Sequence, residues 1–88
     1  MFTIKYWPTN WQQKHYIKRA IELSAQINEH GFDTCEIEEG EKQQFDIFHN
    51  GELVLSQVTL GELSGQKFRL PVKEDVDEML DRLDPHSG

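Results

Sequence analysis

The first third of the chain changes from a strand-like to a helical pattern of apolar residues. Apolar residues alternate with polar ones over residues 2–6, which predicts a strand because successive side chains of a strand point to opposite faces. From Trp11 the spacing becomes helical, and His30 followed by Gly31 is a typical helix end. The predicted apolar stripe of this helix comprises Ile17, Ala20, Ile21, Ser24 and Ile27.

The middle of the chain has the pattern of three further strands. Residues 32–37 and 45–49 both alternate between apolar and polar positions. Asn50 and Gly51 then predict a two-residue hairpin turn, because both central residues of a type I′ turn need positive φ. Residues 53–57 form the returning strand of this predicted hairpin.

The last third of the chain is predicted to hold a loop and a second helix. Residues 58–70 contain two glycines and are interpreted as mostly loop. Pro71 precedes a helix that ends at Asp84 and Pro85, and residues 86–88 form a flexible tail. The apolar stripe of this helix comprises Val76, Met79, Leu80 and Leu83.

The predicted order of elements is strand, helix, strand, hairpin and helix. A strand–helix–strand unit of this length favours a parallel pair with a right-handed crossover, to which the hairpin adds antiparallel strands. This order predicts an α/β fold: a minimal thioredoxin-like β-α-β-β-β-α domain, with a mixed sheet and two helices, over residues 1–85. The main competitor is a ferredoxin-like α+β sandwich, which places its hairpin between two strand–helix units and ends on a fourth strand.

The length and the charge of the chain narrow its class. Its 88 residues allow one domain with one modest core. With 9 Lys and Arg against 16 Asp and Glu the net charge is −7, which disfavours nucleic acid and anionic membrane surfaces as partners. No apolar run approaches the roughly 18 residues of a membrane span, and we expect a cytoplasmic protein.

The chain offers little catalytic chemistry. A single cysteine, Cys35, excludes an intramolecular disulfide and a cysteine-based zinc or iron–sulfur site within one chain. The four histidines lack a two-ligand metal spacing, and neither a phosphate-binding glycine loop nor a nucleophile elbow is present in the sequence. We therefore predict no catalytic residue, no metal and no cofactor.

Three blocks of residues resemble the selenoprotein W-like (Rdx) family. Residues 4–10, Ile-Lys-Tyr-Trp-Pro-Thr-Asn, are similar to the strand and Cys-x-x-Cys opening of that family. Residues 45–56, Phe-Asp-Ile-Phe-His-Asn-Gly-Glu-Leu-Val-Leu-Ser, resemble its hairpin, and residues 68–83 resemble its terminal helix more loosely. The resemblance implies a thioredoxin-like fold and a thiol-redox role. Trp7 and Asn10 occupy the positions of the redox pair, so this chain is interpreted as a redox-inactive relative.

Three functional hypotheses follow. The first is a protein-interaction module that binds a partner through the degenerate redox loop, which comprises Trp7, Pro8, Thr9, Asn10 and Trp11. The competing interpretation is that the two tryptophans cover the end of the sheet. The second hypothesis is a thiol-redox protein that acts through Cys35. The competing interpretation is that Cys35 is a buried, inert thiol. The third is an acidic binding protein for a basic partner, and an open sheet edge also allows a homodimer.

Overall fold

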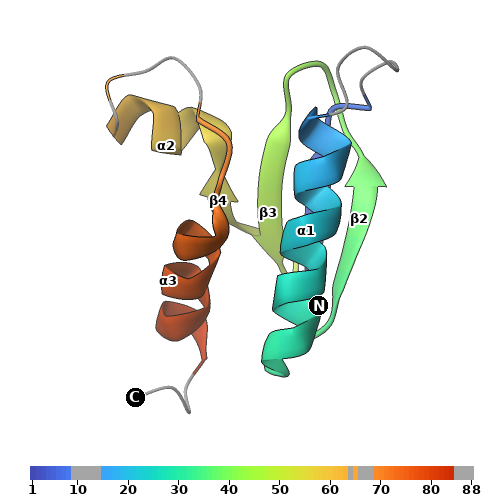
Figure 1. The fold of residues 1–88 in the computed structure, drawn as a ribbon, viewed down its shortest axis with the longest axis vertical. Coiled ribbons are helices and arrows are strands. Elements are labelled where there is room, and N and C mark those ends of the chain that lie inside the picture. The colour runs from blue at the N-terminus through green and yellow to red at the C-terminus, as the bar shows by residue number, and fades with distance from the viewer. Residues whose placement is uncertain (9–14, 64, 66–68, 85–88) are drawn as a thin grey trace.

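The computed structural model of the protein describes residues 1–8, 15–63, 65 and 69–84 (Figure 1). The predicted tail at residues 86–88 lies outside this range. Over the described residues the elements follow one another as β1 (Phe2–Tyr6), α1 (His15–His30), β2 (Cys35–Glu39), β3 (Phe45–His49), β4 (Glu52–Ser56), α2 (Gln57–Leu63) and α3 (Lys73–Leu83).

The strands form one mixed sheet in the order β2-β1-β3-β4. β1 pairs in parallel with β2, which follows it after the α1 crossover, and pairs antiparallel with β3. β3 and β4 form the antiparallel hairpin. The predicted α/β class with a mixed sheet is confirmed, and the arrangement is compatible with a small thioredoxin-like domain.

The described residues form three helices where the sequence predicted two. The segment interpreted as mostly loop begins with α2, whose buried residues are Gln57, Leu60 and Gly61. A helix this short has a weak sequence signal, because most helical stability in proteins comes from tertiary packing. Here the packing partner is β4, against which α2 lies (Figure 1).

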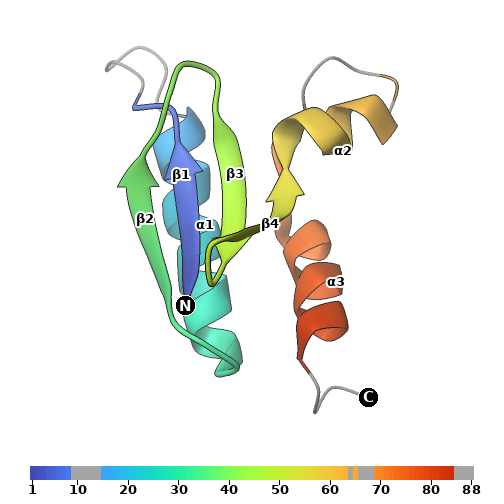
Figure 2. The same ribbon diagram turned by 180° about the vertical axis from the view of Figure 1, so that it is seen from behind.

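Helices α1 and α3 lie side by side on one face of the sheet. The Arg19 guanidinium donates to the Pro71 carbonyl at 2.7 Å, and Gln26 Nε2 donates to the Lys73 carbonyl at 3.0 Å. At the other end of both helices, His30 Nε2 lies 3.3 Å from Asp84 Oδ2. In Figure 2 none of the drawn helices lies in front of β1, β2 and β3, so no helix of the described residues covers the opposite face of these strands, which we call the open sheet face.

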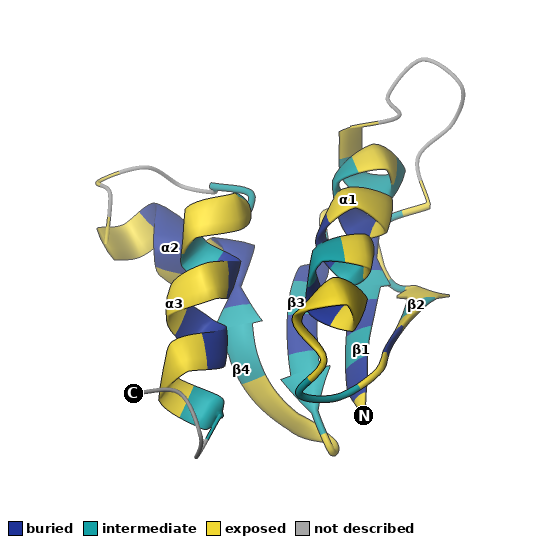
Figure 3. Cartoon of the chain, turned by 60° about the horizontal axis from the view of Figure 1, so that its bottom comes forward, coloured by how far each residue is buried: buried dark blue, intermediate teal, exposed yellow. Residues whose placement is uncertain are grey.

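The core lies between the sheet and these two helices (Figure 3). The predicted alternation of β1 is confirmed, since Phe2, Ile4 and Tyr6 are buried. The predicted stripe of α1 is partly wrong, because Ile21 is 54% exposed whereas Leu23 is 2% exposed. The buried residues of α1 are Ala20, Leu23 and Ile27, so the stripe includes Leu23 in place of Ile21. The buried core comprises Phe2, Ile4, Tyr6, Ala20, Leu23, Ile27, Cys35, Phe45, Ile47, Val76, Met79 and Leu80.

The hairpin confirms the predicted turn and adds a bulge. Asn50 and Gly51 have φ angles of 52° and 87°, as a type I′ turn requires. The pairing register shifts so that Ile47 lies opposite Leu55 while Phe48 lies opposite Leu53. Val54 is therefore the extra residue of a β-bulge, which twists the strand locally.

Four predicted strand boundaries are wrong. β2 spans Cys35–Glu39 and not residues 32–37. β4 spans Glu52–Ser56 and not residues 53–57, because Gln57 begins α2. The Thr34 carbonyl accepts the Phe2 N–H at 2.7 Å, so the chain before β2 is already bonded to β1.

Candidate functional site

The degenerate redox loop begins directly after β1. Trp7 is half-buried and Pro8 is exposed. The other predicted loop residues, Thr9, Asn10 and Trp11, lie outside the described residues. The structure therefore places the first two members of the predicted partner-binding site at the end of the sheet.

Two contacts hold Trp7. Its backbone N–H donates to the Gln44 carbonyl at 2.8 Å, which continues the β1–β3 pairing beyond the strand. Its indole meets the Tyr16 ring edge to face, with ring centroids 5.4 Å apart. Trp7 thus packs on the start of α1, and the residue as a whole is half-buried.

A buried glutamine, Gln57, contacts the residue on which Trp7 packs. Gln57 is 1% exposed, and its amide lies 3.4 Å from the Tyr16 hydroxyl. Its Nε2 also donates to the Gln43 carbonyl, in a turn where Gln43 adopts a positive φ of 61°. Gln57 connects α2, α1 and the β2–β3 turn. No sequence pattern predicts this role of Gln57, because a polar residue after an apolar strand looks like an ordinary strand end.

Cys35 lies far from the degenerate redox loop. In the β1–β2 register it is the partner of Phe2, whereas the loop follows Tyr6 at the opposite end of β1. The thiol is buried, and burial raises its pKa above the ordinary value. The Asn28 side chain makes two hydrogen bonds to the Cys35 backbone. The Cys35 N–H donates to Asn28 Oδ1 at 2.9 Å, and Asn28 Nδ2 donates to the Cys35 carbonyl at 3.2 Å.

A polar cluster lies at the start of β1, on the same end as Cys35. The Asp33 carboxylate accepts from the amino group of Met1 at 2.7 Å and from Thr34 N–H at 2.8 Å. His49 Nε2 lies 3.1 Å from Asp33, and the His49 ring stacks on Phe2. The bond from the Met1 amino group, followed by the Thr34 N–H bond, lowers the pKa of Asp33 to about 2.

This pKa predicts a pH dependence of stability. Because the folded pKa lies below the ordinary value of about 3.9, the contribution of Asp33 is present above about pH 4 and is lost as the pH falls towards 2. We expect Asp33→Asn to reduce the stability lost between pH 4 and pH 2, as measured by urea unfolding at several pH values. An unchanged slope in that window would contradict the assignment.

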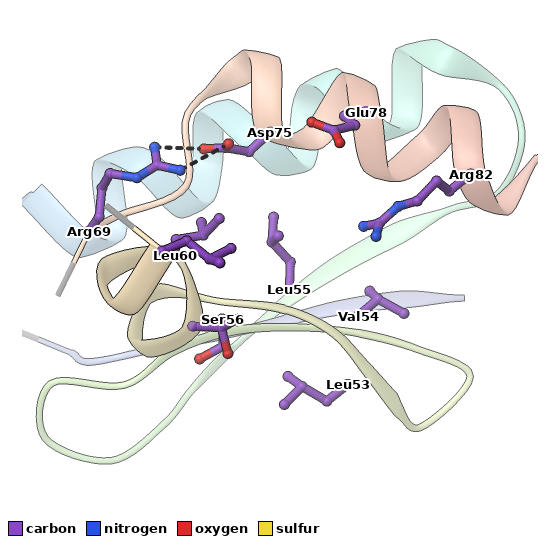
Figure 4. Close-up of a pocket in the computed structure, with 11 residues that line it drawn as sticks. Leu53, Val54, Leu55, Ser56, Leu60, Arg69, Asp75, Glu78 and Arg82 are labelled. Atoms are coloured by element: carbon purple, nitrogen blue, oxygen red, sulfur yellow. Dashed lines mark hydrogen bonds and ion pairs between the residues drawn. The ribbon is translucent and has the colours of Figure 1, made fainter. Parts of the chain in front are cut away.

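A groove of about 470 Å³ lies between β4 and α3, with α2 at one end. We name it the β4–α3 groove (Figure 4). Arg69 and Asp75 close one end through two parallel bonds of 3.0 and 3.1 Å. Its lining comprises Leu53, Val54, Leu55, Ser56, Thr59, Leu60, Leu63, Arg69, Asp75, Glu78 and Arg82.

Asp75 also begins α3. Its carboxylate accepts the Val72 N–H at 2.9 Å, which satisfies a free donor at the helix start. Burial alone would raise the pKa of Asp75, but the bonds from Arg69 and Val72 outweigh it and hold this pKa below its usual range. The sequence did not predict the groove, because its residues come from three elements whose packing has no local pattern.

Comparisons with known proteins add no family. No family model matches the chain, and neither a curated protein nor a solved structure matches it. Within the described ranges no helix is long and apolar enough to cross a membrane. Among the same residues no group of three or more His, Cys, Asp or Glu is placed to hold a metal ion. The selenoprotein W-like resemblance stays a prediction from the sequence.

Proposed function

We propose that the protein is a redox-inactive, thioredoxin-like interaction module that resembles selenoprotein W-like domains. The observation that supports this proposal is the residue content at the end of β1. A thioredoxin-like protein keeps its reactive thiols there, and this chain has Trp7 and Asn10 at those positions. Thiol–disulfide exchange requires a thiolate that attacks a disulfide sulfur, and neither side chain supplies one.

The single thiol of the chain, Cys35, does not take over the role of a redox pair. Cys35 is buried at the opposite end of β1, and its raised pKa disfavours the thiolate at neutral pH. A lone free thiol of this kind is compatible with a reducing compartment. We therefore also propose a cytoplasmic location.

The proposed binding surface is the degenerate redox loop. Half-exposed tryptophans are frequent anchors of protein interfaces, because they bury a large area with few rotatable bonds. The Trp7 ring already packs on Tyr16, and its backbone is bonded to Gln44, so less side-chain freedom is lost when a partner covers the ring.

The thiol part of the proposal predicts slow labelling of Cys35. We expect iodoacetamide to modify the folded protein at pH 7 far more slowly than the protein unfolded in guanidinium chloride, because burial blocks access and disfavours the thiolate. Mass spectrometry over time measures both rates. Labelling of the folded protein at the unfolded rate would instead favour the redox hypothesis for Cys35.

The binding part is tested by loop variants. Partners captured by the purified protein should be lost with Trp7→Ala and with Trp11→Ala, while circular dichroism shows that both variants fold. Ile21→Ala is the matched control, since Ile21 is an exposed apolar residue on α1. Capture that survives both tryptophan replacements would rule out this surface.

The open sheet face favours the acidic-binding hypothesis as a second candidate. Glu36 and Glu38 are exposed on this face, and Asp46 lies across from Lys5 in the register. Such a surface favours a basic partner, and the association should weaken as salt rises. Glu36→Gln with Glu38→Gln should reduce binding more than the equally charged control with Glu29→Gln and Glu62→Gln. Equal losses of binding in the two double variants would show that the net charge of the protein, and not this face, determines the association.

A further inference from the structure

The β4–α3 groove runs along the outer edge of the sheet. It is lined by four consecutive residues of β4, from Leu53 to Ser56. Successive residues of a strand point to opposite faces, so a groove that meets all four follows the strand edge and not one face. Figure 4 agrees, since Leu55 points towards α3 whereas Leu53 lies on the side of β4 away from it.

β4 is an edge strand. It ends the sheet order and pairs only with β3 in the described part of the chain. The backbone groups along such an edge can pair with an extended segment of another protein. The bulge at Val54 interrupts the regular ladder of this edge, so an incoming segment can pair only over a short stretch.

α3 supplies two charges on the groove side. Glu78 and Arg82 both line the groove, and their side chains lie on the side of α3 that faces β4 (Figure 4). Asp75 is already engaged by Arg69, whereas neither Glu78 nor Arg82 has an ion-pair partner among the described residues. These two charges are therefore available to an occupant of the groove.

The spacing of these charges matches an extended chain. Four residues of an α-helix rise about 6 Å, and two residues of a strand span about 6.6–6.8 Å. Side chains two residues apart on an incoming strand thus face Glu78 and Arg82 together. The residues between them point to the other face, where Leu53 is 51% exposed.

The direction of the incoming strand sets the order of its charges. α3 runs opposite to β4 (Figure 1). A segment that pairs antiparallel with β4, which is the more stable pairing, runs in the same direction as α3. It meets Glu78 first and Arg82 second.

We propose that the β4–α3 groove binds an extended segment of a partner protein by strand addition to β4. The segment carries a basic side chain, two residues later an acidic one, and apolar residues between and around them. Neither Trp7 nor Pro8 lines the groove, so this inference goes beyond the proposed function, and each can fail without the other.

Two peptides of identical composition test the proposal. The first, acetyl-Thr-Val-Lys-Val-Glu-Val-Thr-amide, has the matching order, and the second exchanges its Lys and Glu. Both have no net charge, so the acidity of the protein affects them equally. In ¹⁵N-resolved NMR titrations the first should shift amides of residues 53–56 and 78–82 and bind about fivefold more tightly, as two weak ion pairs allow.

A charge exchange in the protein should invert this preference. In the double variant Glu78→Lys with Arg82→Glu the second peptide should become the tighter ligand. Exchange of Lys73 and Glu74, which lie on the same helix outside the groove lining, should leave the original preference unchanged. All four positions are exposed, so the variants should fold, as circular dichroism will check. Absence of binding, equal affinities or shifts confined to other surfaces would overturn the proposal.

Discussion

Leu23→Ala is expected to lower the free energy of unfolding by about 2–5 kcal/mol, whereas Ile21→Ala should change it by less than about 0.5 kcal/mol. The two residues lie two positions apart on α1. Leu23 is 2% exposed and belongs to the core, and Ile21 is 54% exposed. Removal of a buried Leu side chain loses its transfer free energy and leaves a cavity, while an exposed Ile already contacts water.

Urea unfolding followed by circular dichroism measures both variants. Because domains of this size are stable by only about 5–15 kcal/mol, the loss in Leu23→Ala should shift the midpoint strongly with little change in slope. The apolar pattern of the sequence places Ile21 in the buried stripe, whereas the structure buries Leu23. The two variants therefore test which of these residues contributes to the core. A larger loss in Ile21→Ala would show that α1 is rotated from the orientation described.

Gln57→Leu should cost about 1–3 kcal/mol although it makes a buried residue more apolar. The reason is that the Gln43 carbonyl and the Tyr16 hydroxyl lose their buried partner. Gln26→Leu is the matched control, because its amide bonds to Lys73 and Asp77 are exposed and water can replace them.

The same substitution reports on the candidate site. Tyr16 packs against Trp7, so loss of the Gln57 contact should shift the emission of Trp7 to longer wavelength, measured with Trp11→Phe as the background. Equal stability losses for Gln57→Leu and Gln26→Leu, with unchanged Trp7 emission, would show that Gln57 does not support this end of the sheet.

Local chemistry explains which elements were predictable. Positive φ at Asn50 and Gly51 is a property of the two residues themselves, and the strict alternation of Phe2, Ile4 and Tyr6 admits one buried face. The buried stripe of α1 was predicted only in part. Apolar residues cover more than half a turn there, and only contact with β1 and β2 decides that Leu23, not Ile21, faces the core.

The candidate site divides in the same way. Trp7 and Asn10 stand where the family resemblance would place a redox pair, and a lone cysteine tends to be buried; both points could be made without coordinates. The half-buried position of Trp7, the support from Gln57 and the separation of Cys35 from the loop were not. Each depends on residues from different elements that the sheet order brings together or keeps apart.

By itself, the sequence determined the turn, the alternation of the first strand, the mixed α/β class and the fact that Cys35 is the single thiol of the chain. Tertiary structure alone decided the rotation of α1, the existence of α2 and the β4–α3 groove. The physical reason is the range of the interactions. Turn geometry and strand periodicity are set within a few residues, whereas burial, a seven-residue helix and a groove between a strand and a helix exist only after distant segments pack.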